Sequence, residues 1–205
     1  MKRLYDGLVL ASSNPGKIRE VSEMLAGLSL TVAPQSQFQV SDADETGLTF
    51  VENAILKARH AALRTGLPAI ADDSGLVVDA LQGAPGIYSA RYAGVGATDE
   101  ANLQKVLSEI RDIPAEQRTA RFVCVLVCML HPLDPTPIVC EGTWEGTLVT
   151  THVGQYGFGY DPIFWVPTHH CTSAELLPAV KNALSHRGQA LRSLLAALRT
   201  RGFAG

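Results

Sequence analysis

The chain has 205 residues, of which 46% are hydrophobic and 18% are charged, and its formal net charge is -3. This length is sufficient to bury a sizeable core in one large domain or in two small lobes. The slightly acidic balance argues against a broad basic surface for nucleic acid, so any phosphate site must be local. The apolar residues near the start are too few and too interrupted for a signal peptide or a membrane span, so we expect no membrane partner.

The first expected strand, Gly7 to Ala11, leads through a loop into a helix. Apolar residues at helical spacing indicate the helix, and they are Ile18, Val21, Met24 and Leu25. The loop consists of Ser12, Ser13, Asn14, Pro15, Gly16 and Lys17. A helix start offers unpaired N–H groups and partial positive charge, to which Lys17 adds a full charge, so this loop suits a phosphate group. The alternative is an N-cap loop with a solvated lysine.

A second strand is expected at Leu30 to Ala33, followed by a polar, turn-rich segment. The next helix should begin at Thr49, which forms a capping box with Glu52. Asn53 and Lys57 lie one helical turn apart on the same face, so they could point together at a ligand. The alternative for these two residues is a hydrated helix face.

Asp72 and Asp73 stand between two apolar runs, Pro68 to Ala71 and Leu76 to Leu81. Apolar runs bounded by turn residues indicate buried strands, which places the two acids at a strand end. Carboxylates there are costly to desolvate without a positive partner, and a divalent cation is the usual partner when the substrate is anionic. Gly75 would let the backbone approach a ligand. A solvated Asp-Asp-Ser-Gly turn is the alternative.

The second half of the chain adds a helix after Thr98 and a pair of longer strands. Arg121 to Leu130 is a long apolar run, and Pro137 to Val149 is its expected partner. The short turn between the two strands makes them antiparallel neighbours, so we expect a mixed sheet.

Two later segments offer groups that could recognise a base. Glycines on both sides of Phe158 expose its ring for stacking beside Asp161, although a bend with a core phenylalanine is the alternative. Ser185 is the expected N-cap of the last helix, where His186 and Arg187 can donate hydrogen bonds to a ligand. Solvated residues of a helical first turn are the alternative there.

The cysteines and histidines do not indicate a zinc site. The cysteines are Cys124, Cys128, Cys140 and Cys171, and none belongs to a Cys-x-x-Cys pair. We expect them to be buried thiols in a reducing cytoplasm. His169 and His170 are adjacent, and neighbouring side chains do not converge well on one metal.

Taken together, the motifs resemble the inosine triphosphate pyrophosphatase-like family, which acts on non-standard purine nucleoside triphosphates. The matching stretches follow the family's order from about Leu8 to Leu198, and they are Ser12-x-Asn14-x-x-Lys17, Glu45 to Phe50, Glu52 to Ala58, Ala71 to Leu76, Gly83 to Tyr92, Phe158 to Phe164 and Ser185 to Leu191. Two departures concern the rim of the base pocket. Leu177 to Val180 stands where members often carry acids before Lys181, and Tyr156 replaces a usually small residue.

The resemblance implies an elongated α/β fold in which helices flank a mixed sheet. Residues 1–205 would form a single domain with two lobes and a central cleft, and the protein would be a homodimer. Its implied activity is hydrolysis of ITP, dITP or XTP to the monophosphate and pyrophosphate with Mg²⁺. Such an enzyme removes these nucleotides before they enter DNA or RNA.

The same resemblance implies roles for individual residues. The triphosphate would be held by Lys57 and the loop Ser12 to Lys17. Glu45 and Asp73, with Asp72 nearby, would hold the metal, and Asp73 would also accept a proton. Ser74 would contact the substrate, and the base and sugar would be bound by Phe158, Gly159, Tyr160, Asp161, Lys181, His186 and Arg187.

Discrimination against adenine would rest on the 6-oxo group of the purine, which guanine also carries. His186 and Arg187 can donate to an oxygen there, whereas the amino group of adenine would place donors against donors, a mismatch worth about 10⁴-fold. Two alternatives remain open at this point. One is a pyrophosphatase of standard or modified pyrimidine nucleotides, and the other is a nucleotide-binding module without catalysis.

Overall fold

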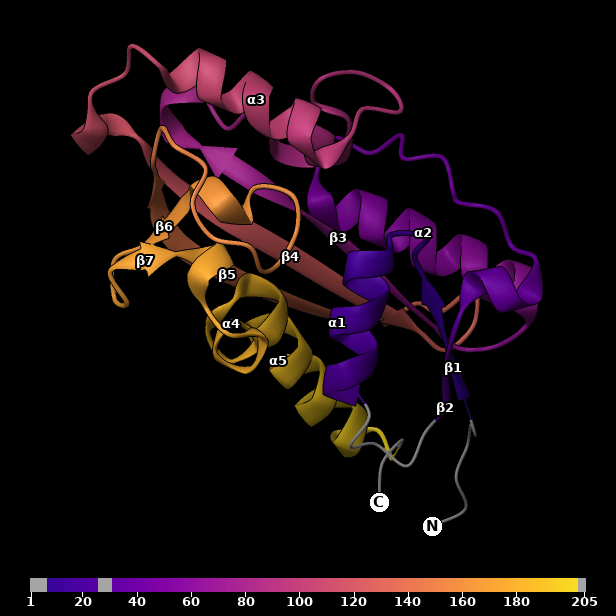
Figure 1. The fold of residues 1–205 in the computed structure, drawn as a ribbon. Helices are drawn as coiled ribbons and strands as arrows, with labels where there is room; N and C mark the ends of the chain where they lie inside the picture. Colours follow the sequence, from indigo (N-terminus) through magenta and orange to yellow (C-terminus); the bar gives the residue numbers. More distant parts are fainter. Residues whose placement is uncertain (1–6, 26–30, 203–205) are drawn as a thin grey trace. The chain divides into compact units, whose positions relative to one another are not determined.

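The computed structural model describes residues 7–25 and 31–202. Within these residues, seven strands form one sheet in the order β2-β1-β3-β4-β5-β6-β7 (Figure 1). The strands are β1 (Gly7–Ala11), β2 (Thr31–Pro34), β3 (Ala69–Val78), β4 (Thr119–Met129), β5 (Ile138–Leu148), β6 (Phe164–Val166) and β7 (Cys171–Thr172). Strand β1 pairs in parallel with β2 and β3, whereas β6 pairs antiparallel with β5 and β7. The prediction of a mixed sheet is therefore confirmed.

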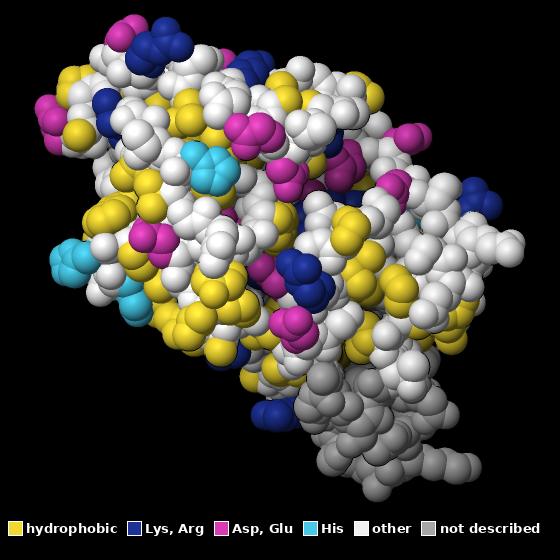
Figure 2. Space-filling model, in the orientation of Figure 1, with side chains coloured by type: hydrophobic (Ala, Val, Ile, Leu, Met, Phe, Trp, Pro, Cys, Tyr) yellow, Lys and Arg dark blue, Asp and Glu magenta, His cyan; other side chains and the backbone are white. Residues whose placement is uncertain are grey.

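Among the described residues, three α-helices connect strands and two follow the last strand. They are α1 (Pro15–Leu25), α2 (Phe50–Thr65), α3 (Asp99–Ile110), α4 (Pro178–Leu184) and α5 (His186–Thr200). The predicted start of α2 is confirmed, because the Thr49 hydroxyl accepts a hydrogen bond from the Glu52 amide. Within the described ranges, no helix combines the length and the apolar character that crossing a bilayer requires. Acidic and basic side chains are interspersed on the face shown in Figure 2.

The chain divides into two compact units, each with its own hydrophobic core. Unit 1 comprises residues 1–73, 124–142 and 187–205, and unit 2 comprises residues 74–123 and 143–186. The core of unit 1 joins Leu10 of β1, Val21 of α1 and Leu194 of α5. The core of unit 2 is built around Val106 of α3 and two aromatic residues, Trp144 and Phe164. The predicted central cleft between two lobes stays a prediction.

Strand β3 corrects one expectation from the sequence. The sequence predicts the two acids at a strand end, with a solvated Asp-Asp-Ser-Gly turn as the alternative, but β3 continues without interruption from Ala69 to Val78. The prediction that the two acids lie at a strand end was therefore wrong. Both aspartates are buried within the strand, where cationic side chains pair with them and offset the cost of burying their charge.

Candidate functional site

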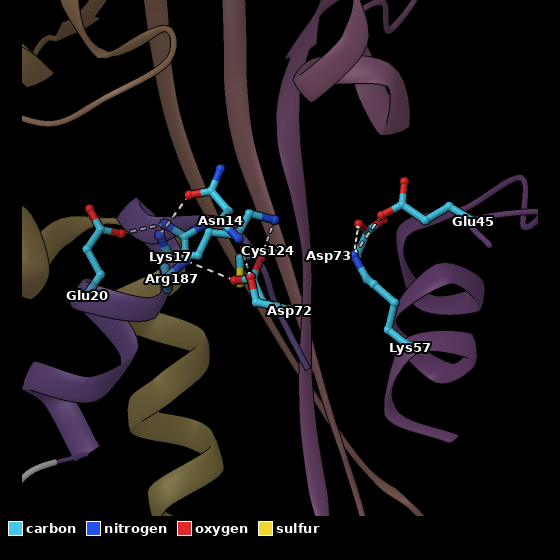
Figure 3. Close-up of polar contacts among 10 residues, drawn as sticks. Asn14, Lys17, Glu20, Glu45, Lys57, Asp72, Asp73, Cys124 and Arg187 are labelled. Carbon is cyan, nitrogen blue, oxygen red and sulfur yellow. Dashed lines mark hydrogen bonds and ion pairs between the residues drawn. The ribbon is translucent and has the colours of Figure 1, made fainter. Parts of the chain in front are cut away.

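Asp72 and Asp73 point to opposite faces of β3. Successive side chains of a strand alternate between faces, so neighbouring acids in one strand do not converge. In Figure 3, Asp72 faces α1 and α5, and Asp73 faces α2. The structure therefore gives the two acids separate partners in unit 1, and only one of them lies with Glu45.

Asp72 lies in a buried network of charges. Its two carboxylate oxygens contact Lys17 Nζ at 2.6 Å and Arg187 Nε at 2.8 Å, and the Cys124 thiol donates to it at 3.2 Å. Burial by itself would raise the pKa of Asp72, but the charges of Arg187 and Lys17 outweigh burial and hold this pKa well below its usual value. Asp72 is thus the anionic centre that orders two cations.

Glu20 and Cys124 belong to this network, and the sequence reasoning missed both. Arg187 Nη1 lies 2.5 Å from Glu20 Oε2, which links α5 to α1. Glu20 sits three residues after Lys17, a spacing that places both on one face of a helix, so helical periodicity could have indicated it. Nothing in the pattern around Cys124 indicated that its thiol would meet a carboxylate.

The loop before α1 is shaped by its own side chains. The Ser12 hydroxyl accepts from the Asn14 amide at 3.2 Å, and Asn14 Oδ1 accepts from the Lys17 amide at 3.0 Å. Pro15 and Gly16 are the first two residues of α1, where the missing N–H of proline is no loss. Ser13 turns outward and donates to Asp42 at 2.6 Å. The loop thus brings Lys17 to the Asp72 network.

Asp73 forms a second cluster with Lys57 and Glu45. Lys57 Nζ lies 2.6 Å from Asp73 Oδ1 and 3.0 Å from Glu45 Oε1. Asp73 is only 5% exposed, and its second oxygen, Oδ2, has no hydrogen-bond partner in the part of the chain that the structure describes. Burial raises the pKa of Asp73 above its usual value, although Lys57 and Lys17 oppose this rise. An ionised Asp73 therefore has an acceptor position available for a proton, a donor or a cation.

In unit 2, Asp161 organises the segment around Phe158. Its Oδ2 accepts from the Phe158 amide at 2.8 Å and from Lys181 Nζ at 2.6 Å, and its Oδ1 accepts from the Ser173 hydroxyl at 2.8 Å. The Lys181 ammonium lies 5.2 Å from the centre of the Phe158 ring. Asp161 thus brings together an aromatic ring and a cation, two groups that suit a base. Ser173 was not expected from the sequence.

The other expected base-binding residues have different neighbours. The His186 ring stacks on Phe122 with centroids 4.8 Å apart and an interplanar angle of 12°, and it is buried. The Tyr160 hydroxyl donates to the Ser89 carbonyl at 2.8 Å, so this group anchors backbone. The Gly159 amide donates to Asp99 at 3.0 Å. Ser74 follows Asp73 along β3 and is half-buried.

Gly157 gives a direct test of the geometry around Asp161. A Cβ atom at Gly157 would lie 2.0 Å from Asp161 Oδ2, and the residue has a φ of 79°. We expect Gly157→Ala to lower the free energy of unfolding by about 1–2 kcal/mol for the left-handed backbone and about 1–3 kcal/mol more for the overlap. Gly66→Ala is the matched control, because Gly66 has a φ of 69° and open space around it. Equal losses in urea denaturation would contradict the proposed packing.

Comparisons with known proteins agree with each other over nearly the whole chain. A model of the Ham1 family matches residues 8–197. A protein of Photobacterium profundum named dITP/XTP pyrophosphatase is 62% identical over 192 residues, which cover 94% of this chain and 98% of that protein. Two solved structures are also similar. A HAM1 protein from Coxiella burnetii has 52% identity and a TM-score of 0.88, covering 95% of this chain and 98% of that one. The Ham1 protein of Staphylococcus aureus has 43% identity and a TM-score of 0.84, covering 95% and 99%.

Proposed function

This chain belongs to the Ham1 family, as its motifs predicted, and we propose that it hydrolyses ITP, dITP and XTP to the nucleoside monophosphate and pyrophosphate. The names of the relatives support this substrate class. The single observation that carries the proposal is the Asp73 carboxylate, which is buried beside Lys57 and Glu45 with one oxygen atom unpartnered among the described residues. Such a group is suited to act on a ligand rather than to support the fold.

We propose Mg²⁺ as the cofactor, held by Asp73 and Glu45. The described residues contain no group of three or more histidine, cysteine or acidic side chains that could hold a metal. Two carboxylates are nevertheless a suitable set for Mg²⁺, which commonly binds one or two carboxylates and takes its other ligands from phosphate and water. The unpartnered Asp73 Oδ2 supports this fit. When bound, the ion would neutralise phosphate charge and polarise the phosphorus.

The side chains of Asp73, Lys17 and Lys57 supply the remaining chemistry in this proposal. Asp73 accepts a proton from the attacking water, which requires its ionised form and an accessible lone pair. Lys17 and Lys57 meet the charge that develops on the departing pyrophosphate. Both lysines are held by aspartates in the structure, at 2.6 Å each. They are therefore ordered before a ligand arrives, which lowers the entropy cost of binding.

For the base end of the substrate we propose the residues around Phe158, with His186. Phe158 offers a ring for stacking, Lys181 offers a cation beside that ring, and His186 offers a donor for a 6-oxo group. The expected contact of Arg187 with the base stays a prediction. Its Nε and Nη1 donate to Asp72 and Glu20 in the structure.

A substrate panel tests the proposed function. Pyrophosphate release should be fastest with ITP, dITP and XTP, slow with ATP, dTTP and UTP, and absent when EDTA removes Mg²⁺. The expected preference for a 6-oxo purine over ATP is about 10⁴-fold, because a buried donor that meets another donor loses its hydrogen bond. Preferred release from dTTP or UTP would identify a pyrimidine nucleotide enzyme. Tight ITP binding without release would identify a binding module.

We also propose that the protein is a cytoplasmic homodimer. The cysteines Cys124, Cys128, Cys140 and Cys171 are free thiols, which supports a reducing compartment.

A further inference from the structure

Asn53 is a buried polar residue that the proposed chemistry does not use. It lies in the first turn of α2 and has no exposed surface. Its Oδ1 accepts a hydrogen bond from the Gly47 amide at 2.9 Å. Because an amide N–H can only donate, this bond fixes which side-chain atom is the oxygen, and the amide nitrogen must point elsewhere.

That nitrogen, Asn53 Nδ2, has no hydrogen-bond partner in the described part of the chain. Leaving a buried donor unsatisfied destabilises the folded state, so a protein rarely retains one without a purpose. Asp73 Oδ2 is an unsatisfied buried acceptor in the same unit. A ligand that brings both an oxygen acceptor and a cation or a donor would satisfy the two atoms together.

The segment that Asn53 holds is closely packed against α2. The Leu48 amide donates to Glu52 Oε2 at 2.9 Å. A Cβ atom at Gly47 would lie 2.6 Å from Glu52 Cβ and 2.8 Å from Asn53 Oδ1. Gly47 is thus required for its small size, and its position is defined by Asn53.

This anchoring reaches the proposed metal site through Glu45, which lies two residues before Gly47. Lys57 is one helical turn after Asn53, on the same face of α2, and its ammonium contacts Glu45 at 3.0 Å and Asp73 at 2.6 Å. One face of α2 therefore holds the Glu45 segment at two points. The first point is the backbone at Gly47, and the second is the Glu45 carboxylate.

We propose that Asn53 is a positioning residue for Glu45, and that its free amide donor binds an oxygen atom of the ligand held at Asp73. The inference rests on the proposed function of this site. Asn53 Oδ1 fixes the backbone two residues after Glu45, which keeps the Glu45 carboxylate within reach of a cation. Asn53 Nδ2 then completes its hydrogen bonding only when the ligand is present.

The test compares Asn53→Ala with Thr49→Ala. Both changes weaken the start of α2, because Thr49 is its N-cap and Asn53 lies in its first turn. Only Asn53→Ala releases the Gly47 amide. In Asn53→Ala we expect faster hydrogen exchange at the Gly47 amide by NMR and about 10–100-fold weaker Mn²⁺ affinity by electron paramagnetic resonance. Gly47→Ala, which retains Asn53, should weaken the affinity for Mn²⁺ to a similar extent. Unchanged Mn²⁺ affinity in Asn53→Ala and Gly47→Ala would overturn the positioning role. So would a loss of Mn²⁺ affinity in Thr49→Ala equal to that in Asn53→Ala.

Asn53→Asp separates the two halves of the proposal, because it keeps an acceptor for Gly47 and loses the donor. We expect Gly47 protection to persist while the KM for ITP rises at least tenfold. A wild-type KM would refute the donor role. The exchange and Mn²⁺ measurements do not depend on which nucleotide is hydrolysed. Failure of the wild type to hydrolyse ITP would therefore reject the proposed function separately from this inference.

Discussion

Replacing Asp73 by asparagine should lower the turnover of ITP by about 10²–10⁴-fold and leave the fold intact. The loss follows from removal of the proton acceptor, since an amide oxygen is too weakly basic to replace a carboxylate in general base catalysis. Removal of a proposed metal ligand would add to this loss. Pyrophosphate release at saturating ITP and Mg²⁺ measures the effect.

The stability of the same variant is informative. Burial raises the pKa of Asp73, which means that the folded state disfavours its ionised form relative to the unfolded chain. A neutral asparagine removes that desolvation cost, and Lys57 keeps Glu45 as a partner at 3.0 Å. We therefore expect a free energy of unfolding equal to or slightly above that of the wild type at neutral pH.

Asp44→Asn is the matched control for activity, because Asp44 is an exposed acid in the same segment as Glu45. It should retain wild-type turnover. If Asp73→Asn turned over ITP near the wild-type rate, Asp73 would not be the base. A large loss of stability in Asp73→Asn would show that Asp73 serves the fold.

Local sequence signals predicted much of the fold because they depend on neighbouring residues. The Gly7–Ala11 strand has the predicted bounds, and α2 and α3 begin at the expected N-caps, Thr49 and Thr98. Each cap needs only the chemistry of a few adjacent side chains. The short strands β6 and β7 and the helix α4 were not predicted, since segments of two to seven residues carry little periodicity.

The candidate site was harder to derive, because tertiary contacts decide which face each side chain takes. A turn at Asp72 and Asp73 would let both acids face one ligand, whereas a continuous strand separates them. The Arg187–Glu20 pair joins residues 167 positions apart, a contact that no local pattern encodes. The family motifs located Lys17, Lys57 and Asp73, but the pairing of Lys17 with Asp72 and of Lys57 with Asp73 emerges only from the fold.

Replacing Asp72 by asparagine should cause a large loss of stability, in contrast to Asp73→Asn. Asp72 is completely buried against Arg187 and Lys17, and breaking one partner out of a buried ion pair costs about 3–5 kcal/mol. Asparagine keeps the shape and can still accept a hydrogen bond, so the loss would report the missing charge. Urea denaturation at neutral pH measures it.

Asp79→Asn is the matched control, because it makes the same change in a solvent-exposed pair with Arg121 and should cost less than about 1 kcal/mol. The pH dependence gives a second check. The pKa of Asp72 is depressed in the folded state, so its contribution is fully present above the unfolded value of about 4 and is lost as pH falls below it. The stability advantage of the wild type over Asp72→Asn should therefore shrink below about pH 4. Equal stability of the two proteins at pH 7 would show that Asp72 is not the anchor of Lys17 and Arg187, and would return it to consideration as a metal ligand.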